Sequence, residues 1–306
     1  MLAAFLSTIL FSISVICGHR SAKLIGGTEA NFWRLTTATI LLGVWSYGWG
    51  AGLSGAAFPM FLVSGIAGIG VGDVGLFQAL PRLGSRLSLL FIQCLGAPLA
   101  ALIEWLWLQT PLTTTQIVCA ITILVGVGIA LSPGKHLKVS RAEFLIGSAF
   151  ALMGALGNAS GAVLSRKAYA IMRANGETLS GHDAAFQRIV GGLAIAGLCV
   201  LAAKWHWFRM GGCRRDGSGL EAARQKLLGV WPWVLANSLA GQTLGMTCMQ
   251  RALETIPTGL VLSITATTPI VVMPLAYVFE HEKPTRYSVI GGIIAVAGVV
   301  GLVRTH

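Results

Sequence analysis

Long apolar windows, each about the length of a membrane-spanning helix, follow one another along this chain between charged or Gly/Pro-rich breaks. The strands of a transmembrane β-barrel would instead show about ten residues of alternating polarity. The pattern therefore predicts an all-α integral membrane protein with ten transmembrane helices. The predicted helices cover residues 1–17, 30–47, 58–80, 85–107, 113–132, 143–165, 184–203, 229–250, 256–279 and 287–303.

Composition agrees with a membrane protein and narrows its partners. Of the 306 residues, 55% are hydrophobic and only 11% are charged, which excludes an ordinary soluble domain. The net charge is +11, but the basic residues lie in loops between the apolar windows, so they favour anionic membrane lipids over nucleic acid. The six cysteines have no C-x-x-C spacing and no G-x-x-x-x-G-K-[ST] stretch is present, so we predict no metal and no other cofactor.

Internal symmetry relates the two halves of the chain. Adding 173 to a position in the third to fifth windows reaches its counterpart in the eighth to tenth, as for Gly68 and Gly241, Gly72 and Gly245, and Pro111 and Pro284. Earlier in the chain, Arg34 matches Arg188 at an offset of 154, and Ser14 matches Ser160 at an offset of 146. We predict a five-helix repeat at 1–132, a linker at 133–142 and a second repeat at 143–306. Five spans per repeat is an odd number, so the second repeat enters the membrane inverted, an arrangement typical of transporters with a central cavity.

One acid, Asp73, interrupts the otherwise uncharged apolar run 58–80. A charge inside a bilayer costs at least a few kcal/mol and tends to mark an ion or substrate path, although an acid paired with an arginine can also fix helix packing. At about 100° per residue, the small residues of this window form a ridge for close helix packing, and Asp73 points to another face together with Phe77. The ridge comprises Gly65, Gly68, Gly72, Gly75 and Ala79.

A polar face recurs in the second half. Gln242 and Gln250 stand on one helical stripe, with Met246 between them at the position that matches Asp73. The predicted cavity therefore carries a carboxylate on one side only.

Other polar residues inside the windows complete the candidate site. Arg34 and Arg188 each lie about a turn inside a window, where they either pair with Asp73, reach the cavity or extend to the headgroups. Amides and hydroxyls in spans bond a neighbouring helix or their own backbone, or contact a ligand. The predicted substrate-binding residues are Asp73, Arg34, Arg188, Gln242, Gln250, Phe77, Asn158, Ser160 and Gln93, with no catalytic and no metal-binding residue.

Several motifs resemble a known family. The chain carries A-L-x-x-x-P-x-G-L at Ala252–Leu260, a mid-helix Pro269, F-E-H-E-K-P at Phe279–Pro284 and I-G-G-x-x-A-V-A-G-V from Ile290. In these residues it resembles the EamA-type, ten-helix branch of the drug/metabolite transporter superfamily, although Gln109 stands where the second half has Glu282. The resemblance implies a cavity lined by helices 1 to 4 and 6 to 9, with helices 5 and 10 peripheral.

Three functions follow from these features. The first is a secondary transporter that exports a small polar metabolite, such as an amino acid, whose carboxylate and amine an Arg and an Asp across one cavity can satisfy. The second is a transporter of an anionic metabolite such as a sugar phosphate or nucleotide sugar, which requires several cationic side chains. The third is an intramembrane enzyme, for which His182 and Asp183 are an adjacent pair of catalytic residue types with no third group to support them.

The charges of the loops between windows bear on the orientation of the chain in the membrane. We expect a multi-pass protein of the plasma or inner membrane, as a monomer or homodimer, with a small-molecule substrate. Most Lys and Arg residues fall in the loops after odd-numbered windows, which places these loops in the cytoplasm and both termini outside. The family resemblance implies the opposite, with both termini inside, so the orientation stays open.

Overall fold

Every regular element in the described part of the chain is helical. The computed structural model describes residues 2–108, 113–130, 140–209, 229–255, 261, 264–280 and 286–303. Gln109, Glu282 and most of the predicted linker 133–142 lie outside this part. The elements are α1 (Leu2–Ile25), α2 (Gly27–Trp49), α3 (Phe58–Gly65), η1 (Ile66–Val71), α4 (Gly72–Leu108), α5 (Thr114–Ala130), α6 (Arg141–Ala174), α7 (Gly181–Arg209), η2 (Ser238–Gly245), α9 (Met246–Thr255), α11 (Thr268–Glu280) and α12 (Arg286–Val303). Residues 229–237 are also helical and lead directly into η2, and both η1 and η2 are π-helical.

Several of these helices suit a bilayer by length and hydropathy. Within the described residues, the segments Leu2–Ile25, Phe58–Ala100, Arg141–Ala174 and Gly181–Trp205 are long and apolar enough to cross it, and Thr268–Phe279 and Val289–Gly298 are shorter apolar helices. Many large apolar side chains are exposed, among them Ile121 and Val125 of α5 and Ile293 of α12. Such a surface suits lipid rather than water.

Two helices run well past the apolar windows that predicted them. The window 1–17 becomes α1, which continues to Ile25, and the window 143–165 becomes α6, which continues to Ala174. A prediction from hydropathy alone places the end of a helix at its first charged residues. Arginine and lysine are nevertheless good helix formers, so the helix itself can continue through them. The α6 helix ends where Gly176 adopts a positive φ of 68°, a conformation that glycine reaches without strain.

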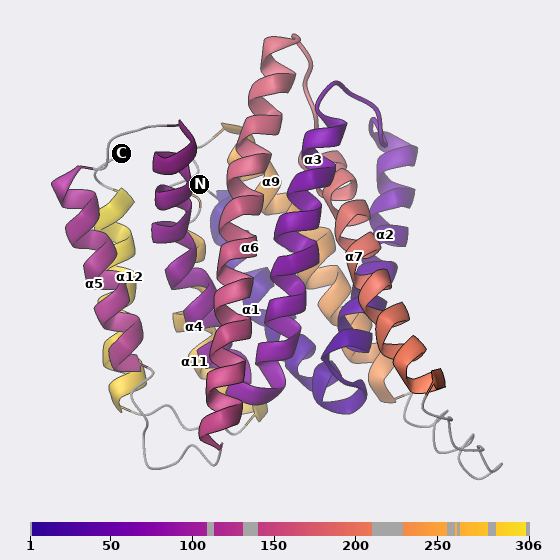
Figure 1. The fold of residues 1–306 in the computed structure, drawn as a ribbon. Helices are drawn as coiled ribbons and strands as arrows, with labels where there is room; N and C mark the ends of the chain where they lie inside the picture. The colour runs from indigo at the N-terminus through magenta and orange to yellow at the C-terminus, as the bar shows by residue number, and fades with distance from the viewer. Residues whose placement is uncertain are drawn as a thin grey trace.

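The long segment from α3 to α4 reverses direction at Gly84. This residue has φ 79° and ψ 168°, which are not helical values, and the parts before and after it lie antiparallel in Figure 1. The predicted break between the windows 58–80 and 85–107 is therefore present, and glycine is the residue that tolerates its backbone conformation. Pro98 and Pro274 lie inside helices, but Pro269 lies in the first turn of α11, after the turn at 266–267, and so is not mid-helix.

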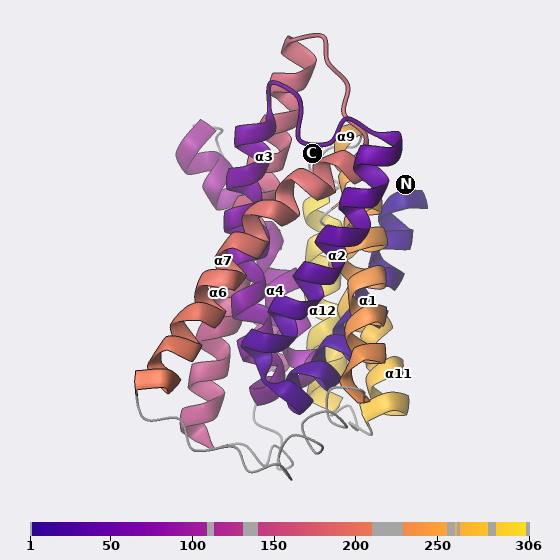
Figure 2. The same ribbon diagram turned by 90° about the vertical axis from the view of Figure 1, so that its right-hand side faces the viewer.

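The helices surround a centre that α5 and α12 do not reach. These two helices pack mainly on each other at one edge, to the left in Figure 1, where Gly126 and Gly298 allow the close approach. The α6 helix packs most extensively on α4, and α2 packs on α7 (Figure 2). The α1 helix packs on η2 and on α11.

Matching positions of the two halves make matching contacts. The π-helical segment η1, shifted by 173, falls inside η2. A Cβ at Gly43 of α2 would meet the ring of Phe186 of α7 at 3.3 Å, and a Cβ at Gly197 of α7 would meet the ring of Phe32 of α2 at 3.9 Å. Both pairs of residues differ by 154, and the crossed pairing means that α2 and α7 run antiparallel.

Candidate functional site

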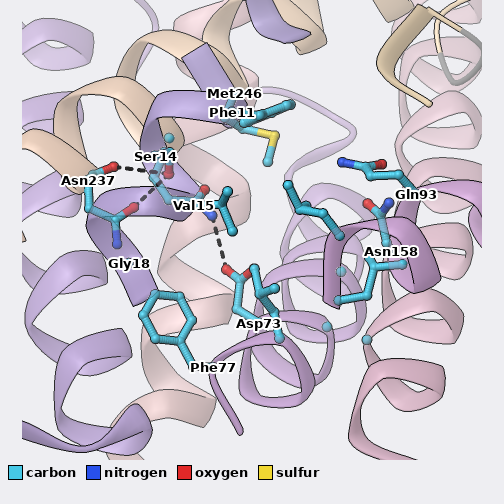
Figure 3. Close-up of a pocket in the computed structure, with 18 of the residues that line it drawn as sticks. Phe11, Ser14, Val15, Gly18, Asp73, Phe77, Gln93, Asn158, Asn237 and Met246 are labelled. Carbon is cyan, nitrogen blue, oxygen red and sulfur yellow. Dashed lines mark hydrogen bonds between the residues drawn. The ribbon is translucent and has the colours of Figure 1, made fainter. Parts of the chain in front are cut away.

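A cavity lies between the two halves of the chain. Its walls come from α1, α2, η1, α4, α6, the 229–237 helix, η2 and α9, together with Thr265. It leaves about 90 Å³ for the centres of water molecules. One water needs about 10–15 Å³ by this measure, so the cavity holds roughly six waters or a small solute. Figure 3 shows it bordered by Asp73 and Phe77 on one side and by Phe11 and Met246 on another.

Asp73 forms the charged centre of the cavity wall. Its Oδ2 accepts hydrogen bonds from Nη2 of Arg34, in an ion pair, and from Nε2 of Gln242 at 3.0 Å. The Asp73 side chain is 14% exposed, so its charge is compensated by protein groups rather than by bulk water. Both of these hydrogen bonds go to Oδ2, so no hydrogen bond from the described residues occupies Oδ1, which can accept one from a ligand in the cavity.

Several contacts fix Arg34 in place for this ion pair. Its Nη2 also donates to Oδ1 of Asn31 at 3.0 Å, and its guanidinium lies 4.7 Å from the ring centroid of Phe77. The backbone carbonyl of Arg34 accepts a hydrogen bond of 3.0 Å from the hydroxyl of Ser238. A buried guanidinium held by an acid, an amide and an aromatic face is well compensated.

The glycine ridge allows close packing against α6, while Asp73 of α4 points to the cavity. A Cβ added to Gly68 would lie 3.2 Å from Cα of Gly161, and one added to Gly72 would lie 3.4 Å from N of Asn158. A Cβ added to Gly75 would lie 2.6 Å from N of Gly154. The predicted close packing is confirmed at these three glycines. Gly65 differs, since its Cβ would meet the Arg188 carbonyl of α7 at 1.8 Å.

Polar groups also occupy the other walls. Gln93 of α4 and Asn158 of α6 line the cavity, on the opposite side of the view from Ser14 and Asn237 (Figure 3). Ser14 Oγ donates to Asn237 Oδ1 at 2.6 Å, and Asn237 Nδ2 has no partner among the described residues. The cavity thus offers a carboxylate oxygen, amide groups and apolar surface.

Three predicted site residues lie outside the cavity lining. Ser160 donates to the carbonyls of Leu156 and Gly157 of its own helix, at 2.8 and 3.0 Å. Gln250 is fully buried, with Nε2 3.8 Å from Sδ of Met246. Arg188 is 3% exposed and lies behind Met246, with Nη1 3.3 Å from the same sulfur atom. The other six predicted residues all line the cavity: Asp73, Arg34, Gln242, Phe77, Asn158 and Gln93.

Asn237 is a cavity residue that the sequence analysis missed. It precedes Gln242 by five residues, a spacing that puts two side chains about 140° apart on an α-helix. The intervening η2 segment is π-helical, with its i to i+5 hydrogen-bond pattern, and residues five apart come nearer to one face. The signal in the sequence was an asparagine inside an apolar window. An α-helical period places this asparagine on a different face from Gln242, so it was not assigned to the cavity.

His182 and Asp183 serve the packing of α2 on α7. Asp183 is 2% exposed and accepts hydrogen bonds from the hydroxyls of Ser46 and, at 2.6 Å, Ser180. His182 stacks on Trp45 with ring centroids 4.8 Å apart and nearly parallel planes. Neither residue lines the cavity. These contacts stabilise the packing of the first turn of α7 against the last turn of α2.

Comparison with known proteins agrees with this architecture. The sequence model of the EamA-like transporter family matches residues 1–132 and 219–304, well over half of the chain. A crystal structure of another protein has a similar fold, with a TM-score of 0.65 at 16% identity, over 98% of this chain and 94% of that one. No curated protein matches the chain.

Proposed function

The chain belongs to the EamA-like transporter family and is a multi-pass membrane transporter with a small-molecule substrate, not an enzyme; from this premise we propose that it exports a small polar metabolite by alternating access. We place it in the plasma or inner membrane, as a monomer or homodimer. The observation that carries the proposal is the small cavity between the two halves, with the Arg34–Asp73 ion pair in its wall.

Matching contacts in the two halves support alternating access. We propose ten spans in two inverted repeats, 1–132 and 143–306, joined by a linker at 133–142. The matching π-helical segments η1 and η2 and the antiparallel pairing of α2 with α7 are what such repeats would produce. Two inverted halves around one site can exchange conformations, which opens the site to each side of the membrane in turn.

The size and charge of the cavity support a small solute over a large anion. Space for roughly six waters suits a molecule of a few heavy atoms. A nucleotide sugar is far larger, and its phosphates require several free cations. Arg34 is the only cation among the described lining residues and is already paired with Asp73, so the lining does not offer the several free cations that such phosphates require. Oδ1 of Asp73 and the free Oε1 of Gln242 instead suit a ligand that donates hydrogen bonds, such as an amine.

Untargeted mass spectrometry of the medium tests the proposal. Cells expressing the wild-type protein, Asp73→Asn or an empty vector are compared for extracellular accumulation of metabolites. We expect one or a few small polar compounds to accumulate with the wild type and not with Asp73→Asn. A wild-type protein, present in the membrane in normal amount, that enriches no compound would contradict an export function.

A second variant separates a transport role of Asp73 from a structural one. Asp73→Asn leaves Arg34 as a buried cation without its acid, which by itself can damage the fold. The double variant Arg34→Gln/Asp73→Asn removes both charges and keeps side chains of similar size. If the double variant folds and still exports at the wild-type rate, Asp73 has only a structural role. We expect it to fold and to fail in export.

A further inference from the structure

The two arginines at matching positions have very different surroundings. Arg34 has an acid, an amide and an aromatic ring as partners, which are Asp73, Asn31 and Phe77. Both guanidinium groups are equally buried, since Arg34 and Arg188 are each 3% exposed. The difference therefore lies in the partners and not in the burial.

None of the partners of Arg34 recurs around Arg188. The positions that match Asp73, Phe77 and Asn31 hold Met246, Gln250 and Ala185, and no acid is among them. Within the described residues, the polar contact of the Arg188 guanidinium is the 3.3 Å approach of Nη1 to Met246 Sδ, and Nε has no partner in either arginine. A thioether is a weak acceptor and carries no charge. Arg188 is thus, within this part of the chain, a buried cation without an ion-pair contact, since Asp73 is already paired with Arg34.

A buried charge without an ion-pair contact is costly in the interior of a membrane protein and tends to mark a functional site. We propose that Arg188 binds a carboxylate group of the transported solute, which takes the place that Asp73 fills beside Arg34. This inference rests on the proposed transport function and adds the chemical class of the substrate, a small carboxylate-bearing metabolite. Guanidinium and carboxylate form bidentate, charge-assisted hydrogen bonds, the strongest interaction available to a small solute at this position.

The walls of the cavity show how the carboxylate reaches Arg188. Gly68 and Met246 both line the cavity, and Nη2 of Arg188 lies 2.8 Å from where a Cβ on Gly68 would be. Gly68 therefore leaves the guanidinium directly behind the wall with no side chain in between. Met246 covers it from the other side, and an unbranched methionine changes rotamer readily. A rotation of Met246 uncovers Nη1 for the solute.

The same geometry provides a binding group for each charged end of a zwitterionic solute. Arg188 takes the carboxylate, and Oδ1 of Asp73 with Oε1 of Gln242 takes the ammonium group. Asp73 and Gly68 line the same small cavity, and the Arg188 guanidinium lies directly behind Gly68, so one small solute can reach both groups. With the zwitterion bound, each charged group has a partner of opposite sign: Arg34 and the ammonium group share Asp73, and Arg188 has the carboxylate.

Binding of matched probes to purified protein tests this assignment. The shift of the thermal unfolding temperature is measured with the standard L-amino acids, each beside its carboxamide, which lacks the carboxylate charge. We expect at least one amino acid to bind the wild type roughly tenfold to a hundredfold more tightly than its carboxamide. Arg188→Gln loses that preference. Met246→Asp also loses it, because the new carboxylate pairs with Arg188, whereas Met246→Asn, of the same size but uncharged, retains it.

Each other outcome overturns the assignment. Equal binding of amino acids and carboxamides, or an unchanged preference in Arg188→Gln or Met246→Asp, means that Arg188 does not hold a carboxylate. A folded wild-type protein that none of the probes stabilises overturns it as well. The export measurement then shows whether the transport function fails as well. If the compounds enriched in the medium carry no carboxylate, the export function stands and only the assignment to Arg188 falls. If no compound is enriched, both the export function and the assignment to Arg188 are contradicted.

Discussion

Arg34 of α2 and Asp73 of α4 form an ion pair in the wall of the central cavity, and Gln242 of η2 joins it through a 3.0 Å hydrogen bond to the same carboxylate oxygen. The pair ties two helices of the first half together, and the amide brings in the second half. A change at any of these residues therefore affects both packing and the cavity.

Removal of one charge of this pair will destabilise the protein more than removal of both. We expect Asp73→Asn or Arg34→Gln to lower the free energy of unfolding by about 3–5 kcal/mol, because either leaves a buried charge unpaired. The double variant should lose much less than the sum. Thermal unfolding of purified protein measures this coupling, and additive losses would show that the ion pair is not formed in the membrane protein.

The close contact of α4 with α6 gives a second prediction, at Gly75. A Cβ there would lie 2.6 Å from both Gly154 N and Phe150 O, and these are backbone atoms that cannot rotate away. We expect Gly75→Ala to force the helices apart and to cost roughly 1–3 kcal/mol of stability. Thermal unfolding of the purified variant measures the loss.

Gly48 of α2 provides the matched control. Nothing lies within 4 Å of a Cβ at this position. Gly48→Ala should therefore keep the wild-type unfolding temperature or raise it slightly, since alanine favours the helix by up to about 1 kcal/mol. Similar losses in both alanine variants would contradict the close packing of α4 on α6.

The sequence predicted the membrane class and most helices because hydropathy alone decides them. The shared face of Asp73 and Phe77 followed from the α-helical period because both lie in α4, whereas the predicted glycine ridge crosses the π-helical η1 at Gly68. The same period failed at Asn237, because η2 is π-helical and residues five apart there lie near one face. A π-helical segment leaves no apolar or polar pattern that a single sequence reveals.

Pairing across the bundle was the other limit. The sequence pointed to Arg34 and Arg188 as partners for Asp73 but could not choose between them, because both match each other in the repeat. The structure places Arg34 on Asp73 and Arg188 on Met246. This choice depends on how α2 and α7 pack against the other half, which no local pattern encodes.

Asp183 will prove to be a structural residue outside the transport path. Its carboxylate accepts hydrogen bonds from Ser46 of α2 and from Ser180 before α7. We expect Asp183→Ala to lower the stability by about 1–3 kcal/mol, because it leaves the buried hydroxyl of Ser46 without this acceptor. Asp183→Asn keeps one acceptor oxygen and should lose less. Equal unfolding temperatures for the wild type and Asp183→Ala would show that this contact does not hold α2 to α7.

Asn158 within α6 and Asn175 just after its end offer a matched pair for testing the cavity. Asn158 lines the cavity, whereas Asn175 follows the last turn of α6 and donates to the Ile171 carbonyl at 2.9 Å. Loss of one neutral hydrogen bond to the solute costs about 0.5–1.5 kcal/mol, so Asn158→Ala should reduce export roughly twofold to tenfold. Asn175→Ala should export at nearly the wild-type rate. The measurement is extracellular accumulation of the compounds that the wild type enriches, normalised to protein in the membrane. Equal export by the two variants would remove Asn158 from the site and leave the opposite wall, at Asp73, to bind the solute alone.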